Sequence, residues 1–234
     1  MAKYNRVLLK LSGEALAGEK STGFDEGTCR KVAAQIKTLV EGGTQIAVVI
    51  GGGNFWRGRT GNEIDRVKAD QIGMIATIMN CIYMSEILRT EGLKTEVFTP
   101  FVCGSFSSLF SKDNALKAFD ENKVVFFAGG TGHPYFSTDT CTALRAIEIE
   151  ADVILAAKAI DGVYSADPKD NPDAFKYEEL SFKKIVDEKL KVIDLTASVL
   201  CMENNMPMLV FGLNEENSII NAVNGCSGGT IITA

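Results

Sequence analysis

The sequence predicts an α/β fold in which a mostly parallel sheet is covered by helices on both faces. Strand and helix patterns alternate along almost the whole chain, and such alternation favours parallel strands joined by helices. Several strands are continuous apolar runs rich in β-branched residues, which is typical of strands buried on both faces. Four of the expected strands end in glycine together with polar or cationic residues, and ligands of such sheets bind beyond the carboxyl ends of the strands.

Hydrophobic periodicity and end signals define the elements of the first half. Asp25 can cap a helix that runs to about Glu41. The apolar residues of 66–90 recur at helical spacing, and Gly92 ends that pattern. The expected order is strand 7–11, helix 25–41, strand 46–50, helix 66–90, strand 95–98, helix 112–120 and strand 124–127.

The second half continues the alternation. Thr138 and Asp139 offer an N-cap for a helix through Glu150. Residues 165–175 are polar with two prolines and are expected to form an ordered loop. The remaining elements are strand 152–157, helices 181–189 and 195–205, strand 208–211, helix 215–223 and strand 230–233. Since no linker divides the chain, residues 1–234 are expected to form one domain.

Composition limits the function. The 234 residues are 46% hydrophobic and 23% charged, the profile of a globular protein. A net charge of −6 argues against a general nucleic-acid surface, and no segment is expected to span a membrane. The six cysteines form no CxxC pair, so we expect structural thiols in a reduced, cytoplasmic protein. The single histidine, His133, excludes His-rich metal sites, and no residue is predicted to ligate a metal.

The end of the second strand is the strongest local sign of a ligand. Ile46–Ile50 leads into Gly51–Gly53, where backbone N–H groups can approach an anion, and Arg57 follows closely. The alternative is an ordinary glycine-rich turn between a strand and a helix. The Walker pattern and the dinucleotide G-x-G-x-x-G pattern are both absent, and position 56 is Trp where the latter needs its third glycine.

Two further features fit a phosphate site. Lys10 lies in an apolar strand and suits a point charge on a transferred phosphate, unless it simply reaches the surface. Residues 131–139 place hydroxyls and glycine before a helix N-terminus, which favours bound phosphate but also suits helix capping alone. Asp139 can cap that helix or orient Lys10.

Three other side chains have both a ligand role and a structural one. Asp70 can accept from a ribose hydroxyl, or can serve the helix dipole. Tyr164 can stack on a base or pack on the sheet. Asp167 can contact a nucleotide or begin the turn at Pro168.

These residues stand in motifs that closely resemble those of the bacterial uridylate (UMP) kinases, within the amino-acid kinase superfamily. The resemblance runs nearly end to end and implies a single-domain, three-layer αβα fold that forms a hexamer. It also implies transfer of the γ-phosphoryl group of ATP to UMP, with Mg²⁺ accompanying ATP, and possible activation by GTP and inhibition by UTP. The motifs that carry it are residues 8–14, 48–54 with Arg57-Gly58, 130–139, 145–152 and 161–168.

The resemblance also assigns roles residue by residue. Catalysis would depend on Lys10, Arg57 and Asp139, while the role of Lys158 stays open. ATP would be bound by Lys10, Leu11, Ser12, Gly13, Gly53, Arg57, Tyr164 and Asp167. UMP would be bound by Gly52, Asp70, Thr131, Gly132, His133, Pro134, Tyr135, Phe136, Ser137 and Thr138.

Two other functions compete with this one. The first is a kinase of the same superfamily that acts on a carboxylate or carbamate, and the second is a non-catalytic nucleotide-binding or storage protein. Asp70 and the loop 130–138 argue against the first, and the presence of both Lys10 and Asp139 argues against the second.

Overall fold

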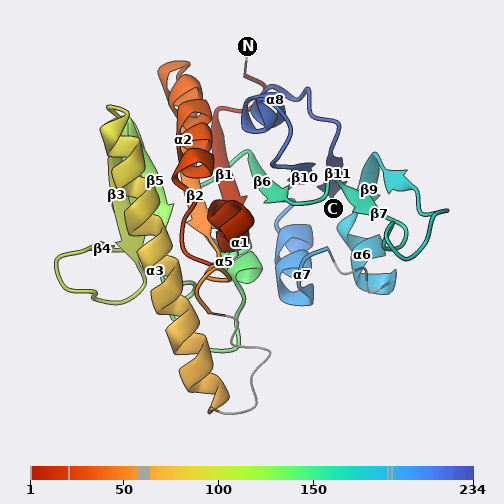
Figure 1. The fold of residues 1–234 in the computed structure, drawn as a ribbon, viewed down its shortest axis with the longest axis horizontal. Coiled ribbons are helices and arrows are strands. Elements are labelled where there is room, and N and C mark those ends of the chain that lie inside the picture. The colour runs from red at the N-terminus through yellow and green to blue at the C-terminus, as the bar shows by residue number, and fades with distance from the viewer. Residues whose placement is uncertain (1, 21, 57–63, 189, 191) are drawn as a thin grey trace.

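A long, twisted sheet forms the centre of the molecule (Figure 1). The computed structural model describes residues 2–20, 22–56, 64–188, 190 and 192–234. Within them the sheet has nine strands, in the order β4 (Ser108–Leu109), β3 (Lys94–Thr99), β5 (Lys123–Phe127), β2 (Gln45–Ile50), β1 (Arg6–Leu11), β6 (Val153–Lys158), β10 (Met208–Gly212), β11 (Thr230–Thr233) and β9 (Glu179–Ser181).

Neighbouring strands of this sheet are parallel except for β10 and β11, which are antiparallel. The strands from β4 to β10 therefore place their carboxyl ends at the same edge. The predicted, mostly parallel sheet is confirmed, with a reversed pair at one end.

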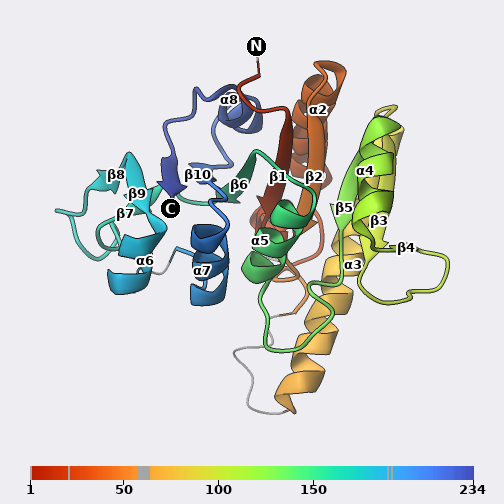
Figure 2. The ribbon, with the colours of Figure 1, turned by 180° about the vertical axis from the view of Figure 1, so that it is seen from behind.

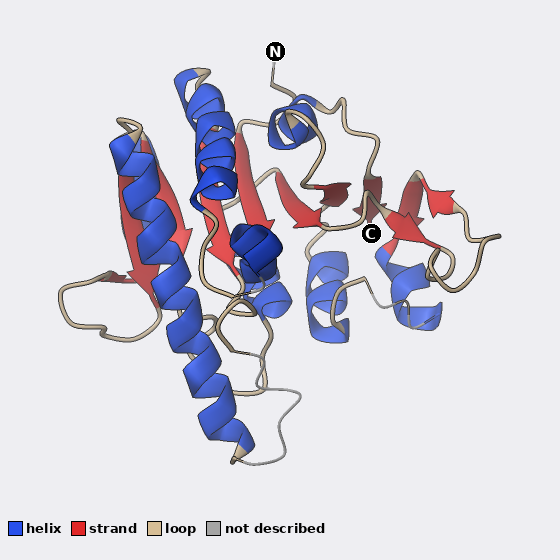
Figure 3. Ribbon diagram, in the orientation of Figure 1, coloured by secondary structure: helices blue, strands red, loops and turns tan. Residues whose placement is uncertain are grey.

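Helices cover both faces of the sheet, as the helices and strands of Figure 3 show. The face seen in Figure 1 carries α2, α3 and α8, and the face seen in Figure 2 carries α4, α5, α6 and α7. Each face has its own apolar core, so the predicted three-layer arrangement is confirmed. The helix bounds are α1 (Gly13–Ala17), α2 (Glu26–Glu41), α3 (Arg66–Thr90), α4 (Lys112–Asp120), α5 (Thr138–Glu148), α6 (Phe182–Glu188), α7 (Leu195–Glu203) and α8 (Ser218–Asn224), with a 3₁₀ turn η1 (Gly18–Lys20) after α1.

The alternation of side chains along β1 decides where Lys10 points. Leu9 and Leu11 join the core under α2, whereas Leu8 joins the core on the opposite face. Because successive side chains of a strand point to opposite faces, Lys10 lies on the same face as Leu8, towards α5.

The order of the strands identifies the expected ligand-binding edge. β1 lies between β2 and β6, and the chain fills one side of the sheet before α5 leads it across to β6. Such a reversal opens a crevice beyond the carboxyl ends of the strands. The ends of β1, β2 and β6 meet there, and all three carry glycine or lysine.

Small elements account for most differences from the predicted order. The helix α1, the edge strand β4, the strand β9 and the two-stranded hairpin of β7 (Val163–Tyr164) and β8 (Lys176–Tyr177) were not predicted. Each of these elements is too short for its apolar residues to show the period of a helix or a strand. The predicted loop 165–175 connects β7 and β8, and the helix predicted at 215–223 begins only at Ser218.

α3 corrects one expectation. By length and composition it could cross a membrane, since its 25 residues include a window with a mean hydropathy of 1.3. However, 56% of that window is buried inside the protein, where Ile78, Cys81 and Met84 pack towards the sheet. The helix therefore belongs to the core.

The buried cysteines match the structural role predicted for them. Cys29, Cys81, Cys141 and Cys201 are all buried, and Cys226 is exposed. Burial raises the pKa of the Cys29 and Cys141 thiols to about 11, so few of these thiols are ionised at neutral pH.

Candidate active site

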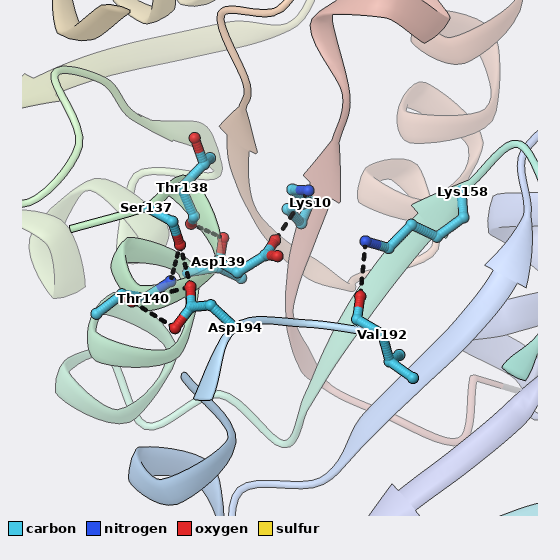
Figure 4. A network of polar contacts seen from close by, with 9 residues as sticks. Lys10, Ser137, Thr138, Asp139, Thr140, Lys158, Val192 and Asp194 are labelled. Carbon is cyan, nitrogen blue, oxygen red and sulfur yellow. Dashed lines mark hydrogen bonds and ion pairs between the residues drawn. The ribbon is translucent and has the colours of Figure 1, made fainter. Parts of the chain in front are cut away.

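An ion pair joins the first strand to the first turn of α5. The Lys10 Nζ atom lies 2.9 Å from Asp139 Oδ1, and the two side chains are 12% and 21% exposed (Figure 4). The predicted N-cap at Thr138 and Asp139 is wrong by one position, because Ser137 caps the helix by accepting from the Thr140 N–H at 3.1 Å. Asp139 is thus available to pair with Lys10, which was one of its two expected roles.

The glycine loop after β2 is held by two buried asparagines. Asn54 and Asn80 exchange hydrogen bonds of 3.0 and 2.8 Å, and Asn80 Nδ2 also donates to the Gly51 carbonyl at 2.6 Å. Neither asparagine was predicted, although Asn80 is a polar residue in an otherwise apolar stretch of α3 and is fully buried. This pair holds the loop in a single arrangement against α3.

Two positions in this region have no room for a side chain. A Cβ atom on Gly13 would lie 2.4 Å from the Gly51 carbonyl oxygen, and one on Gly52 would lie 3.0 Å from the Gly73 carbonyl oxygen. Backbone atoms cannot give way as a side chain can. Because of this crowding, only glycine fits at positions 13 and 52, and no side chain covers the backbone there.

A cavity of about 450 Å³ opens beside Lys10. Its volume is in the range of small-molecule sites. It contains many of the predicted residues together with Glu14, Trp56 and Gly73. The predicted residues that line it are Lys10, Ser12, Gly13, Gly52, Gly53, Asp70, Thr131, Phe136, Ser137 and Thr138.

Asp70 connects α3 to the loop 131–138. Its Oδ2 atom accepts from the Tyr135 N–H at 2.8 Å and from Arg66 Nε at 3.0 Å. Since the N-cap of α3 is Asp65, Asp70 lies one turn further along, where it lines the cavity. Both of these bonds end on Oδ2, so Oδ1 keeps acceptor capacity for a ligand.

The tip of the loop 131–138 lies outside the cavity lining. Gly132, His133, Pro134 and Tyr135 are not among the residues that line it. Tyr135 has a left-handed backbone with φ 71°, and its ring lies 5.3 Å from the Arg66 guanidinium carbon. His133 is exposed, and its N–H and carbonyl both contact the Thr131 hydroxyl. These contacts keep His133 within the loop itself.

A second cavity, of about 580 Å³, lies beyond β6 and contains both Tyr164 and Asp167. The Tyr164 hydroxyl donates to Asp161 at 2.8 Å, and Lys176 pairs with the same carboxylate at 2.7 Å. The Lys176 ammonium and the Tyr164 hydroxyl both lower the pKa of Asp161. These bonds tie the β7–β8 hairpin to the turn after β6, next to the cavity that Tyr164 lines.

Lys158 lies between the ion pair and this second cavity. It lines the cavity, and its Nζ atom donates to the Val192 carbonyl at 3.2 Å (Figure 4). Burial lowers the pKa of Lys158, the charge of Lys10 lowers it further, and Asp139 acts in the opposite direction. Lys10, Asp139 and Lys158 are therefore close enough to act on one another's charge.

Two predicted residues need separate mention. Leu11 is fully buried in the core and its carbonyl accepts from the Gly51 N–H at 2.9 Å, so its side chain is not available to ATP. Arg57 lies outside the described residues.

Asp194 was missed altogether. It caps α7 by accepting from the Ala197 N–H at 2.9 Å, and it also accepts from the hydroxyls of Ser137 and Thr140 on either side of Asp139. In the sequence it is recognisable only as an N-cap, since partners 54 and 57 positions away leave no local signal.

Known proteins match nearly the whole chain. The model of the amino acid kinase family matches residues 5–212. A uridylate kinase of Pediococcus pentosaceus is 47% identical over 233 residues, which cover 98% of this chain and 97% of that protein.

Solved structures agree in fold. A UMP kinase from Bacillus anthracis superposes with a TM-score of 0.94 at 35% identity, covering 98% of this chain and 96% of its own. A UMP kinase from Ureaplasma parvum gives 0.93 at 37% identity, covering 99% and 100%. A uridylate kinase from Archaeoglobus fulgidus gives 0.72 at 27% identity, covering 99% and 100%. The resemblance noted in the sequence is confirmed, and the chain belongs to the amino acid kinase family.

Proposed function

We propose that this protein transfers the γ-phosphoryl group of ATP to UMP, giving UDP and ADP. The observation that carries the proposal is the Lys10–Asp139 ion pair, which borders the first cavity and lies near Lys158 at the second. Relatives named uridylate kinase or UMP kinase support the choice of acceptor.

We assign UMP to the first cavity, where Asp70 offers Oδ1 to the ribose and the hydroxyl-rich segment before α5 faces the phosphate. The nucleoside of ATP goes to the second cavity, beside Tyr164 and Asp167. The ATP phosphates then extend towards Lys10, Ser12, Gly13 and Gly53, with Arg57 assigned by resemblance alone.

The reaction needs positioning more than proton transfer. The second pKa of a phosphate monoester is about 6, so the attacking oxygen of UMP is mostly ionised at neutral pH. A general base is unnecessary, in agreement with the exposed position of His133. Lys10, Lys158 and the backbone N–H groups of the glycine loop stabilise the charge that spreads over the transferred group during in-line displacement.

Mg²⁺ fits this site as a companion of ATP. Among the described residues, no group of three or more His, Cys, Asp or Glu side chains could hold an ion by itself. Mg²⁺ usually keeps several waters and binds substrate phosphates with few protein ligands, so the ATP phosphates would hold it. When bound, it would neutralise part of the negative charge of these phosphates.

ADP release measures the proposed activity directly. The protein is mixed with ATP, Mg²⁺ and one acceptor at a time: UMP, aspartate, glutamate or carbamate. We expect rapid ADP release when UMP is the acceptor, and none with aspartate, glutamate or carbamate. Release with a carboxylate or carbamate instead identifies the competing kinase, and binding of both nucleotides without ADP release identifies a binding protein.

Assembly and regulation belong to the same proposal. We infer that residues 1–234 act as one domain in a cytoplasmic homohexamer that is activated by GTP and inhibited by UTP. An apolar stripe on the outer face of α3 offers a surface for subunit contact: Ile72, Ile75, Met79 and Ile82 are 38–58% exposed. Adding each effector to the ADP-release assay tests the regulation.

A further inference from the structure

We propose that Asp194 is a positioning residue for phosphoryl transfer, holding the first turn of α5 so that Asp139 stays against Lys10. The inference rests on the proposed function and adds a residue to its site. Asp194 lines neither cavity, so it acts through other residues and not on the nucleotides themselves.

The place of Asp139 depends on the turn that carries it. Asp139 is the second residue of α5, and its carboxylate can stay 2.9 Å from Lys10 only while that turn stays in register with β1. Sub-ångström placement matters in such a site, because a shift of about 1 Å costs a factor of about 100 in rate.

Asp194 accepts hydrogen bonds from this turn on both sides of Asp139. The Ser137 hydroxyl donates to Asp194 Oδ2, and the Thr140 hydroxyl lies 3.1 Å from both carboxylate oxygens (Figure 4). The donors precede and follow Asp139 in the chain, so the carboxylate opposes both rotation and sliding of the turn. Since the Ser137 hydroxyl donates its one hydrogen to Asp194, it is not free to donate to UMP.

The short segment 192–194, which precedes α7, also binds Lys158. Val192, two residues before Asp194, accepts the hydrogen bond of Lys158 through its carbonyl at 3.2 Å. The segment before α7 therefore fixes Lys158 on one side and, through α5, the Lys10–Asp139 pair on the other. One segment thus contacts Lys158 directly and the turn of Asp139 through its neighbours.

The fixed negative charge is stabilised where it lies. Asp194 is the N-cap of α7 and bonds the N-cap residue of α5, so the positive ends of two helix dipoles point towards its carboxylate. Three donors, Ser137, Thr140 and the Ala197 N–H, share its two oxygens, so both oxygens act as acceptors.

Asp194→Asn separates this role from simple capping. Asn caps helices as well as Asp does, so α7 keeps its cap, but the amide has one acceptor oxygen in place of two. We expect kcat for UMP phosphorylation to fall about 10- to 100-fold, with KM for UMP and ATP changed less than about twofold. Asp25→Asn, at the matching cap of α2 away from both cavities, should leave kcat unchanged.

Thr140→Val gives an independent measurement, since it removes one donor with almost no change in shape and leaves Asp194 intact. We expect a smaller fall in kcat, and a double variant no slower than Asp194→Asn alone, because coupled residues are not additive. Thr140→Val decides the question if Asp194→Asn fails to fold.

Two results overturn the inference: a lowered melting temperature with unchanged kcat in the folded variants, or a raised KM with unchanged kcat. The wild-type control keeps the two proposals apart. If the wild-type protein does not phosphorylate UMP, the proposed function fails, whereas wild-type turnover with an unaffected variant refutes only the role of Asp194.

Discussion

A lysine in the middle of an apolar strand is the residue on which the proposed chemistry depends. Lys10 follows Leu8 and Leu9, both fully buried, yet its ammonium reaches a carboxylate and the wall of a cavity. Placing a charge on a central strand is costly unless it is paired, so the ion pair with Asp139 explains how the fold tolerates it.

Lys10→Ala should remove catalysis and spare the fold. The variant loses the positive charge next to the transferred phosphoryl group, so we expect kcat to fall by several orders of magnitude, roughly 1,000-fold or more. Circular dichroism should remain that of the wild type, and Lys94→Ala, at an exposed lysine of β3, serves as the control. Near-normal turnover would show that Lys10 is not catalytic.

The lowered pKa of Lys158 should make the free energy of unfolding depend on pH. Because its pKa is lowered in the fold, the folded protein releases this proton at a lower pH than the unfolded chain, whose lysine titrates near 10.5. Between those two values the unfolded chain binds more protons, so stability rises with pH in that window. Below the window the cost of burying the charge is fully present.

The comparison is between wild-type protein and Lys158→Met. Urea denaturation from pH 7 to pH 10.5 should show the wild type gaining stability relative to the variant as the pH rises. Lys94→Met should show no such slope. A wild type that loses stability relative to Lys158→Met in this range would contradict the lowered pKa.

For single residues, the sequence predicts which side chains belong to the site better than it predicts which residues they contact. Lys10, Asp139 and Asp70 are conspicuous because each is a charge in an unusual setting, and the structure places all three at or beside the first cavity. Asp194, Asn54 and Asn80 escape notice because their partners lie 26 to 57 positions away. Local pattern carries no information about such distant pairs.

The elements that matter most for the site are the turns at strand ends, which hold their shape by excluding side chains. The loop of Gly51–Gly53 packs on α3 so closely that the missing Cβ of Gly52 is a structural requirement. The hydrogen bonds of Asn54 and Asn80 then keep that loop in place.

Gly52→Ala should damage stability and activity together. The new Cβ would lie 2.9 Å from Ala76 Cβ and 3.0 Å from a carbonyl oxygen, so overpacking should cost about 1–3 kcal/mol of unfolding free energy. Displacement of the loop should also raise KM for UMP. Gly228→Ala has no atom within 4 Å of its added carbon and should be neutral in both measurements. Equal behaviour of the two variants would refute the close fit.

Long elements are predicted well, and short ones are not. The helices α2 and α3 and the strands β1 and β2 follow from period and composition, because each is long enough to repeat its pattern. The two-residue strands β7 and β8 are supported by Asp161, which bonds Tyr164 of one strand and Lys176 of the other. Such tertiary support is invisible in the sequence.

On the scale of the whole molecule, the long helix α3 serves the core and an outer surface at once. Its inner face packs on the sheet, and its outer stripe leaves Ile75 58% exposed. The helical spacing of Ile72, Ile75, Met79 and Ile82 suits either the core or a subunit contact, with the core as the default expectation. That default is wrong for these four side chains, because the opposite side of the helix is apolar as well and is the side that packs on the sheet.

Ile75→Glu should break up the assembly. A charge in the middle of an apolar contact is unfavourable when it is desolvated, so we expect smaller species than the hexamer in size-exclusion chromatography with light scattering. Ala34→Glu adds the same charge at an exposed position of α2 and should leave the hexamer intact. A wild-type protein that is a stable monomer would contradict the proposed assembly.

The position of β1 at the centre of the sheet has a wider consequence. Among the residues that the structure describes, those that line the first cavity lie within 10–138 and those that line the second lie within 158–210. On the proposed assignment, the acceptor and the nucleoside of ATP are held by separate stretches of the chain, whereas residues 10–53 hold the acceptor and the ATP phosphates together. A change of donor nucleoside can therefore be sought in residues 158–210 alone, whereas a change within residues 10–53 alters how both substrates are held.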